Sequence, residues 1–506
     1  MEEEAEAFQT ICDAGNLLNI VFDSLSKTMA EALGEFFATH AQIVNGYDKH
    51  KSAEWFRVSM AVDEASWRHR LKLGAALEAI GEVDAAIAEF FRAVRDGYAE
   101  ERRPIESLIV SPTSTPSSPV DGRRKVLAIY CDEYGQTWWP NWSHRSLKTG
   151  MGGSEEAAYF MAHEMADLGY TVVIYNDVSE EDRGRDPLNE HVFWRHFREY
   201  DANNPPDVFV AWRYHISLGL ALGDGDGMER VDKVFLWLQD AVGGESFTTS
   251  MCERVDGIFV LSEFHKSFLS EGACRDKGRV TPNGIDVKSQ FNGGGGDGKN
   301  EVGEMVYGSA PNRGLELLLD LWPEIFERLG GGVRLNVYYG FSKSFVEFGL
   351  SGKLGDGFEK WMEGMLKKLH ELEGVEYRGM VSHEELVRAY SDAGYILYPS
   401  VYPETGCVTL MKAMCAGAVP VTSRCKESVV GELGGEWDLG PEEELRSGWG
   451  VEEVAAWGRE YVERVIAAVE GERRGERRER ERMKRESRAR FSWAEVGRKW
   501  KQLMTA

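Results

Sequence analysis

The sequence predicts an α/β protein with two doubly wound, Rossmann-like domains that face a cleft, preceded by a small all-α, repeat-like domain. Short runs rich in β-branched residues alternate with helical segments from residue 123 to residue 290, as is typical of parallel strands buried on both faces. The same alternation starts again at residue 301 and continues to residue 485. Residues 1–107 instead show apolar residues at helical spacing. These three observations predict the order of the domains.

The composition excludes several classes of protein. A chain of 506 residues is too long for one hydrophobic core. Its net charge of −25 argues against nucleic-acid binding, because a phosphate backbone repels such a surface. No apolar run approaches the roughly 18 residues of a membrane-spanning helix, and the N-terminus lacks the apolar part of a secretory signal. Seven cysteines without a C-x-x-C pair favour reduced thiols in the cytoplasm over a disulfide framework or a zinc site.

The first module, residues 1–107, contains a stretch that resembles a tetratricopeptide repeat. In WRHRLKLGAALEAIGEVDAAIAEFFRAV, the small residues Gly74, Gly81 and Ala86 stand at the spacing of that repeat, where they let two antiparallel helices approach closely. A helical hairpin packed on the next domain is the alternative. The module is a candidate site for a protein partner, and residues 108–122, rich in Ser and Pro, are expected to link it to the rest.

Ten short apolar runs are the predicted strands. The runs of the first domain are 125–132, 171–177, 207–212, 233–240 and 257–262. The runs of the second are 304–310, 334–340, 375–381, 395–400 and 418–423. The glycine-rich segment 342–357 is expected to be a surface excursion.

Two glycines stand directly before a helical pattern in the first domain. Gly152 and Gly153 would let a ligand reach bare backbone N–H groups, and Ser154 could cap the helix. The acids Glu155 and Glu156 would repel a phosphate if they pointed at it, so a cation from elsewhere is needed. A pair of glycines before a helix is common, so an ordinary turn is the alternative.

That cation is expected to be Arg313, in the turn between a strand and a helix of the second domain. Such turns point into the cleft of open α/β sheets, and arginine binds phosphate through a planar fork of donors. A surface salt bridge is the alternative.

The strongest motif is YPSVYPETGCVTLMKAMCAG, residues 398–417. A strand ends, a turn rich in proline presents Glu404, and a helix opens after Gly406. The backbone N–H groups of Gly406, Cys407 and Val408 would be free for a phosphate, and Glu404 could accept hydrogen bonds from sugar hydroxyls.

Residues 125–506 resemble retaining glycosyltransferases of the GT-B kind, in particular glycosyltransferase family 4. The matching stretches are GGSEEAAYFMAHEMADLGYTVVIY, FVLSEFHKSFL, VTPNGID, SAPNRGLELLL and YPETGCVTLMKAMCAGAVPVTS. The segment 486–506, with FSWAEVGRKW, is similar to the C-terminal helix that crosses back onto the first domain in that family.

The resemblance implies an enzyme that transfers a sugar, with retention, from a UDP- or GDP-linked donor to a glycan, lipid or protein. It places Gly152 and Gly153 near the donor diphosphate, and it puts Arg313 where the family usually has a lysine. Met380 and Val381 would flank the nucleotide base. Cations and amides would hold the diphosphate, so the resemblance implies no metal and no cofactor beyond the nucleotide sugar.

Glu404 and Arg313 are the catalytic candidates that this resemblance implies. Glu404 would touch the transferred sugar, and the run from Thr405 through Gly406 and Cys407 to Val408 would complete the donor site.

Three departures from the family pattern bear on the donor. Lys412 stands where the family has a second glutamate for the ribose, so either the contact with the ribose is weaker or this lysine meets an oxygen of the nucleotide. Ser309 replaces a second cation, and Gln239 replaces a frequent histidine. A non-catalytic scaffold or a nucleotide-sugar epimerase are therefore the alternative functions.

Candidates for the acceptor side come from the first domain. His215 and Asp240 follow predicted strands, and the tryptophans Trp138, Trp139 and Trp142 could stack on sugar rings. A structural histidine, and tryptophans packed under a long loop, are the alternatives.

Overall fold

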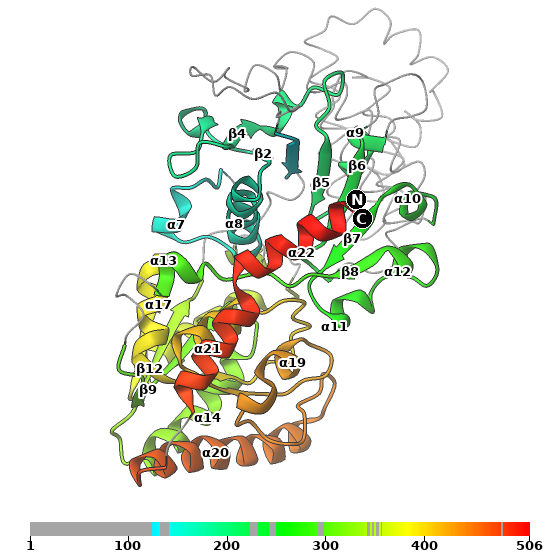
Figure 1. Ribbon diagram of the computed structural model, residues 1–506. Helices are drawn as coiled ribbons and strands as arrows, with labels where there is room; N and C mark the ends of the chain where they lie inside the picture. Colours follow the sequence, from blue (N-terminus) through cyan, green and yellow to red (C-terminus); the bar gives the residue numbers. More distant parts are fainter. Residues whose placement is uncertain are drawn as a thin grey trace, which may run out of the picture.

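The computed structural model describes residues 124–131, 141–222, 231–241, 249–291, 298–341, 345–346, 349–350, 354–355, 357–476 and 479–505. Within them, two α/β halves lie one above the other, and the C-terminal helices run along both (Figure 1). The expected repeat-like module and the Ser/Pro-rich linker lie outside the described residues.

The first half is built on a sheet whose described strands follow the order β3-β4-β2-β1-β5-β6-β7-β8. All neighbouring strands pair in parallel except β3 and β4. The strands are β1 Val126–Tyr130, β2 Thr171–Asn176, β3 Gly184–Arg185, β4 Val192–His196, β5 Val208–Trp212, β6 Lys233–Trp237, β7 Gly257–Val260 and β8 Gly278–Val280.

Helices cover both faces of this sheet, so its central strands are buried on both sides. On one face, α8 packs against alternate side chains of the strands, with Met161 in a cluster that also contains Trp194. On the other face, α9, α10 and α12 contribute Leu218, Met251 and Cys274 to a second cluster. The described helices of this half are α7 Ser146–Thr149, α8 Gly153–Asp167, η3 Glu180–Asp182, η4 Phe197–Glu199, α9 Leu218–Leu222, α10 Thr249–Arg254, α11 Glu263–Lys266 and α12 Ala273–Lys277. The next helix, α13 Val287–Phe291, packs on the core of the second half.

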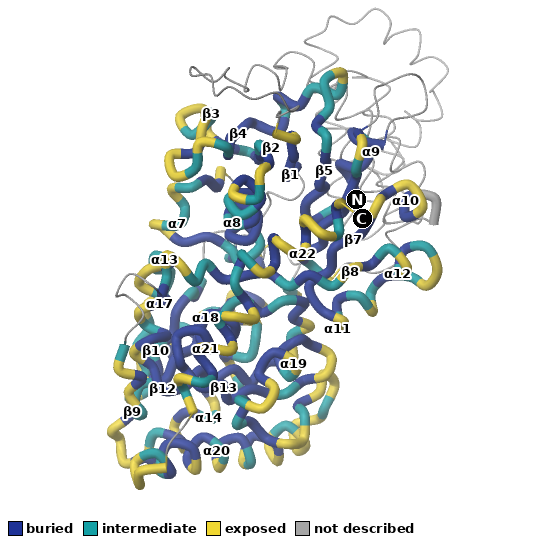
Figure 2. Tube along the Cα trace, in the orientation of Figure 1, coloured by how far each residue is buried: buried dark blue, intermediate teal, exposed yellow. Residues whose placement is uncertain are grey.

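The second half contains a parallel sheet with the order β11-β10-β9-β12-β13. Its strands are β9 Glu301–Ser309, β10 Arg334–Tyr339, β11 Val375–Gly379, β12 Ala393–Tyr398 and β13 Val419–Thr422. Its described helices are α14 Leu315–Arg328, α16 Phe358–Glu371, α17 His383–Asp392, α18 Val408–Ala416, α19 Val430–Gly434, η7 Gly435–Trp437, α20 Val451–Arg473 and α21 Arg480–Phe491. Both sheets form the buried interior, and exposed residues gather on outer helices such as α20 (Figure 2).

The last helix, α22 (Trp493–Thr505), leaves the second half and lies against the first. Its Trp500 is fully buried, with its ring stacked on Phe259 of β7 at a centroid distance of 4.3 Å. Trp493 covers Gly284, where any Cβ would lie 2.5 Å from the indole. The end of the chain thereby ties the two halves together.

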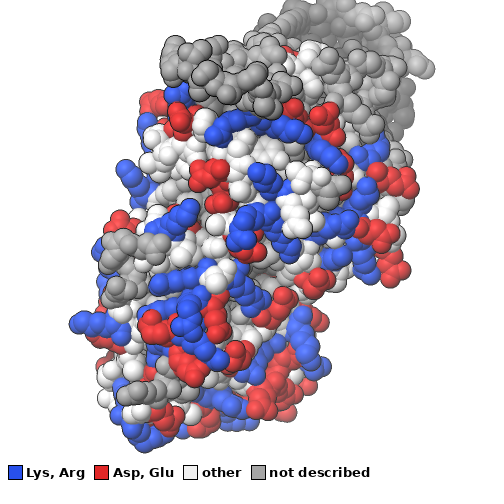
Figure 3. All heavy atoms as spheres, in the orientation of Figure 1, with Lys and Arg blue, Asp and Glu red and all other residues white. Residues whose placement is uncertain are grey.

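Charged side chains of both signs are interspersed on the face shown in Figure 3. In the basic helix α21, Arg480, Arg482 and Lys484 are paired with acids, for example Arg482 with Glu436 at 2.9 Å. None of the described helices is long and apolar enough to cross a membrane.

The predicted fold class is confirmed for the described residues, because each of the ten predicted runs contains a strand of one of two parallel sheets. The strand β4 was not predicted. Its sequence VFWRH ends in Arg195 and His196, yet all five residues are buried at the sheet, with Arg195 paired to Glu199 at 3.1 Å. Because the strand ends in two polar residues, it does not form a continuous apolar run, and the apolar pattern does not predict it.

The expectation that all cysteines are reduced thiols is wrong for one pair. Cys252 in α10 and Cys274 in α12 form a disulfide, with their Cα atoms 4.9 Å apart. Both helices pack on the same face of the first sheet, which brings together two cysteines that are 22 positions apart in sequence. A count of cysteines and a search for short motifs do not detect such a tertiary pairing.

Candidate active site between the two halves

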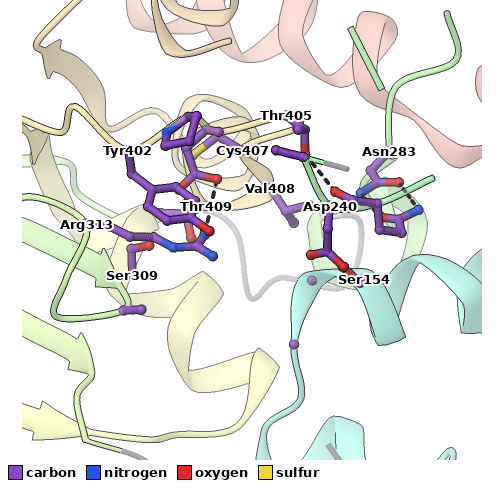
Figure 4. A pocket seen from close by; sticks show the side chains of 18 of the residues that line it. Ser154, Asp240, Asn283, Ser309, Arg313, Tyr402, Thr405, Cys407, Val408 and Thr409 are labelled. Atoms are coloured by element: carbon purple, nitrogen blue, oxygen red, sulfur yellow. Dashed lines mark hydrogen bonds and ion pairs between the residues drawn. The ribbon is translucent and has the colours of Figure 1, made fainter. Parts of the chain in front are cut away.

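A cavity of about 420 Å³ lies between the two halves, at the carboxyl ends of strands from both sheets. Its volume falls in the range of small-molecule sites. Figure 4 shows Ser154 and Asp240 of the first half on one side of this cavity, and Arg313, Ser309 and Tyr402 of the second half on the other. The lining residues that the sequence singled out are Gly152, Gly153, Ser154, Glu155, Gln239, Asp240, Ser309, Arg313, Glu404, Thr405, Gly406, Cys407 and Val408.

The helix α8 begins at this cavity without a capping side chain. Its N-cap is Gly152, so the expected cap by Ser154 is not formed, and the N–H groups of the first turn are left for another acceptor. A Cβ on Gly153 would lie 3.3 Å from Val408 of the other half. Glycine at this position therefore lets the two halves approach closely.

The helix α18 begins at the same cavity from the opposite half. Its N-cap, Cys407, makes no capping hydrogen bond through its side chain within the described residues. A Cβ on Gly406 would lie 2.8 Å from the side chain of Leu261 in the first half. Two helix N-termini, each with free donors and a positive end, thus converge on one space.

The two acids in the first turn of α8 are each held by a cation, so they do not oppose an anion. Glu155 pairs with Arg213 at 2.9 Å, and Glu156 pairs with Lys412 at 2.6 Å. Burial raises the pKa of Glu155, against the opposing effect of Arg213. Burial also acts on Glu156, but Lys412 and His383 outweigh it and lower the pKa of Glu156 to about 2.

We call Glu156, Lys412 and His383 the seam cluster, because it joins α8 of the first half to α18 and α17 of the second. Nδ1 of His383 lies 3.4 Å from both Oε1 of Glu156 and Nζ of Lys412. All three side chains are buried, and none lines the cavity. The expected contact of Lys412 with a nucleotide oxygen is therefore replaced by an ion pair across the seam.

Arg213 is a cavity residue that sequence reasoning missed. It directly follows β5, and its backbone has a φ of 74°, an unfavourable left-handed conformation for a residue with a Cβ. Its guanidinium binds both oxygens of Asp240, with Nη2 3.2 Å from Oδ1, in addition to Glu155. The pattern that could have predicted it is an arginine at the carboxyl end of a buried strand. The predicted candidate was instead His215, two positions later.

In the second half, Arg313 and Glu404 form what we call the cavity pair. Nη1 of Arg313 lies 2.9 and 3.2 Å from the two oxygens of Glu404. Tyr398 donates to Glu404 at 2.6 Å, and the ring of Tyr402 lies 4.3 Å from the guanidinium carbon. Burial acts to lower the pKa of Arg313, but Glu404 outweighs it and the pKa is raised, so the guanidinium stays charged.

Hydrogen bonds join the two halves along one side of the cavity. Thr405 donates to the carbonyl of Gln239 at 2.7 Å, and Ser262 donates to the carbonyl of Thr405 at 2.8 Å. The side-chain amide of Gln239, which stands in place of the family histidine, pairs with Asn283 at 3.0 Å.

Four further candidates are placed away from the cavity. Met380 and Val381 lie at the seam, where a Cβ on Gly150 would be 2.8 Å from Met380. His215 is buried behind β5 and does not line the cavity. Trp142 is also buried, with its ring centroid 5.5 Å from that of Trp194, so it packs under its loop and cannot stack on a sugar.

Trp138 and Trp139 lie outside the described residues. The segment expected to be a surface excursion contributes Phe345 and Leu354 to the cavity wall. Phe345 is buried in a cluster with Phe358, and Leu354 packs against that cluster, so the expectation of a surface position is wrong for Phe345.

No family model matches this chain. A stretch of 166 residues, 32% of the chain, is 30% identical to an uncharacterized glycosyltransferase of Methanocaldococcus jannaschii. The match spans 37% of that relative, so the chain covers little more than a third of its length.

Several solved structures are similar to this chain at low sequence identity. HepE of Anabaena, in complex with UDP, has a TM-score of 0.49 and 13% identity over 75% of this chain and 99% of its own. AviGT4, a glycosyltransferase involved in avilamycin A biosynthesis, has a TM-score of 0.45 and 13% identity over 76% and 97%. Pneumococcal GtfA, in complex with UDP and GlcNAc, has a TM-score of 0.41 and 12% identity over 59% and 56%.

Proposed function

We propose that this protein is a glycosyltransferase that moves a sugar from a nucleotide-diphosphate sugar to an acceptor. The observation that carries the proposal is the convergence of two uncapped helix N-termini, from α8 and α18, on a cavity that also contains Arg313 and Glu404. This combination suits a diphosphate beside a group rich in hydroxyls. The partial likeness to a curated glycosyltransferase supports the same assignment.

Arg313 is suited to hold the diphosphate in addition to Glu404. Its Nη1 is used by Glu404, while its Nε is buried and has no hydrogen-bond partner among the described residues. A buried donor without a partner is costly, and a phosphate oxygen would satisfy it. Glu404 keeps acceptor capacity for a hydroxyl of the transferred sugar, because a carboxylate has about four lone-pair sites.

In the proposed reaction, the bond between the anomeric carbon and the diphosphate oxygen breaks, and its electron pair leaves with the diphosphate. The acceptor oxygen forms the new bond to the anomeric carbon, and its proton passes to an oxygen of the leaving diphosphate. Arg313 and the two helix N-termini stabilise the charge that develops on the leaving group. We propose retention of configuration, as the sequence resemblance implies.

The donor site is proposed to hold the ribose without residue 412. Lys412 is buried at 4% side-chain exposure and bound to Glu156, so it is not available to a nucleotide while the halves are closed. The glycines Gly152, Gly153 and Gly406 remain proposed neighbours of the diphosphate, since they border both helix N-termini.

The test is to titrate the protein with UDP and GDP by calorimetry, and then to follow nucleotide release from UDP- and GDP-sugars. We expect one nucleotide to bind and its sugar derivatives to be turned over. The same measurements on Arg313→Ala test the role of this arginine, with Arg328→Ala as the matched control. Arg328 is the last residue of α14, whereas Arg313 lies just before its first; Arg328 is on the surface and is paired with Glu463 and Glu324. Binding of neither nucleotide would contradict the proposal.

A further inference from the structure

Glu155, Arg213 and Asp240 are the charged part of the cavity wall that the first half contributes, and we call them the first-half wall. Arg213 donates to Glu155 at 2.9 Å and to both oxygens of Asp240. Its left-handed backbone is held by a hydrogen bond from its N–H to the carbonyl of Trp237 at 2.7 Å. Unfavourable backbone conformations that persist in this way are concentrated at binding and catalytic sites.

Asp240 keeps free acceptor capacity that points into the cavity. A carboxylate offers about four lone-pair sites; Arg213 takes one on each oxygen and Tyr214 donates to one more, so about one site remains for a ligand. The side chain of Asp240 is 38% exposed, although that of Arg213 beside it is 7% exposed. Figure 4 shows Asp240 across the cavity from Arg313 and Tyr402, which belong to the proposed donor side.

The charges of the wall also constrain what it can receive. Among the residues that the structure describes, the charged ones that line the cavity are three acids, Glu155, Asp240 and Glu404, and two arginines, Arg213 and Arg313. A bound donor diphosphate adds more negative charge. Burial acts to raise the pKa of Asp240, but Arg213 outweighs it and the pKa is lowered, so this carboxylate stays ionised. An acceptor with its own phosphate or carboxylate near the reacting hydroxyl would be repelled.

We propose, on the basis of the proposed function, that Asp240 accepts a hydrogen bond from a hydroxyl group of an uncharged acceptor sugar, and that this wall rejects anionic acceptors. Arg213 is a positioning residue: it holds the carboxylate of Asp240 in place and does not itself contact the acceptor. Glu155 holds the other edge of the guanidinium.

The experiment uses the full chain, saturated with whichever of UDP or GDP binds. It is titrated with methyl glucoside, methyl galactoside and methyl mannoside, and with methyl glucuronide and methyl galacturonide as anionic counterparts. We expect at least one neutral glycoside to bind the wild-type protein about tenfold more tightly than its uronide. The hydroxyl of the glycoside donates a charge-assisted hydrogen bond to Asp240, whereas the carboxylate of the uronide is repelled by the acids of the wall.

Two variants and a control separate this role from a structural one. Asp240→Asn should weaken the neutral glycoside about tenfold and leave the dissociation constant of the nucleotide within about twofold. Arg213→Lys keeps the charge but not the fork, so it should retain part of the binding. Asp256→Asn is the matched control: Asp256 lies on the same half, is paired with Lys233 at 3.1 Å, does not line the cavity and is 32% exposed. It should behave as wild type.

Three results would overturn the inference while the proposed function stands. The uronide binds as tightly as the neutral glycoside; no neutral glycoside binds the nucleotide-loaded protein; or Asp240→Asn weakens only the nucleotide sugar, which would assign Asp240 to the transferred sugar. If neither UDP nor GDP binds the wild-type protein, the proposed function itself fails and the inference falls with it.

Discussion

The cavity pair and the seam cluster are both contacts between a buried glutamate and a cation, yet they differ in what surrounds them. Arg313 of the cavity pair is 33% exposed and belongs to the same half as Glu404. Lys412 of the seam cluster is 4% exposed and belongs to the opposite half from Glu156. A partly open pair can share its arginine with a ligand, whereas a sealed pair that joins two halves can only be broken at a cost to stability. The same chemistry therefore serves ligand binding in one place and assembly in the other.

Removing the cation of the seam cluster should have the largest effect on stability. Lys412→Ala leaves Glu156 as a buried carboxylate without its main partner, which should cost about 3–5 kcal/mol in the free energy of unfolding. Urea titration measures it. The double variant Lys412→Met with Glu156→Gln removes both charges and should recover most of the loss. A single variant as stable as wild type would show that the seam cluster does not hold the halves together.

The seam cluster should also make the free energy of unfolding depend on pH in the acidic range. The pKa of Glu156 is lowered from 4.5 to about 2, so its contribution is fully present above pH 4.5 and is lost as the pH falls toward 2. That shift corresponds to about 3 kcal/mol. Urea titrations between pH 5 and about 2.5 should show a steeper loss for wild type than for Glu156→Gln. Parallel curves for the two proteins would contradict this assignment.

Arg313→Ala should lower turnover, and it should also lower stability, because it leaves the buried Glu404 without its cation. The negative charge on the leaving diphosphate grows as the glycosidic bond breaks, so the activation barrier should rise by about 2–4 kcal/mol. Arg313→Lys should recover part of this loss, because it keeps the charge and loses the fork. Steady-state kinetics of nucleotide release by the two variants and by the wild-type protein measure these effects. If both variants turn over like wild type, the donor site has been misplaced.

The smallest effect is expected from removing residues 1–117. Neither the cavity pair nor the seam cluster contains a residue from this region, so turnover should stay within about twofold of wild type. The measurement compares nucleotide release by 118–506 with that of the full chain. Loss of nucleotide binding in the shorter chain would show that the first module is part of the catalytic unit.

Much of the fold could be predicted because each strand is a local pattern. The ten apolar runs are read from adjacent residues, and they supply every described strand except β3, β4 and β8. The placement of Arg313 and Glu404 at one cavity was also within reach, because both follow buried strands of the same parallel sheet.

The pairings could not be predicted in the same way. Glu156 and Lys412 are 256 positions apart, and Arg213 and Glu155 are 58 apart, so nothing local connects them. The sequence predicted a cation for the phosphate and not for the acids of α8, and the two residues that pair with these acids are brought to them by the packing of the chain. The disulfide between Cys252 and Cys274 escaped prediction for the same reason.

The central claim is that the cavity transfers sugar from a nucleotide donor, and Glu404→Gln tests it most directly. The variant keeps the size of the side chain and a hydrogen bond acceptor but removes the charge that Arg313 and Tyr398 contact. Transfer of a radiolabelled sugar and calorimetric nucleotide binding are measured on both proteins. The account predicts that wild type transfers the label, and that the variant still binds the nucleotide but loses nearly all transfer. Near-wild-type transfer by the variant, or no nucleotide binding by either protein, would contradict it.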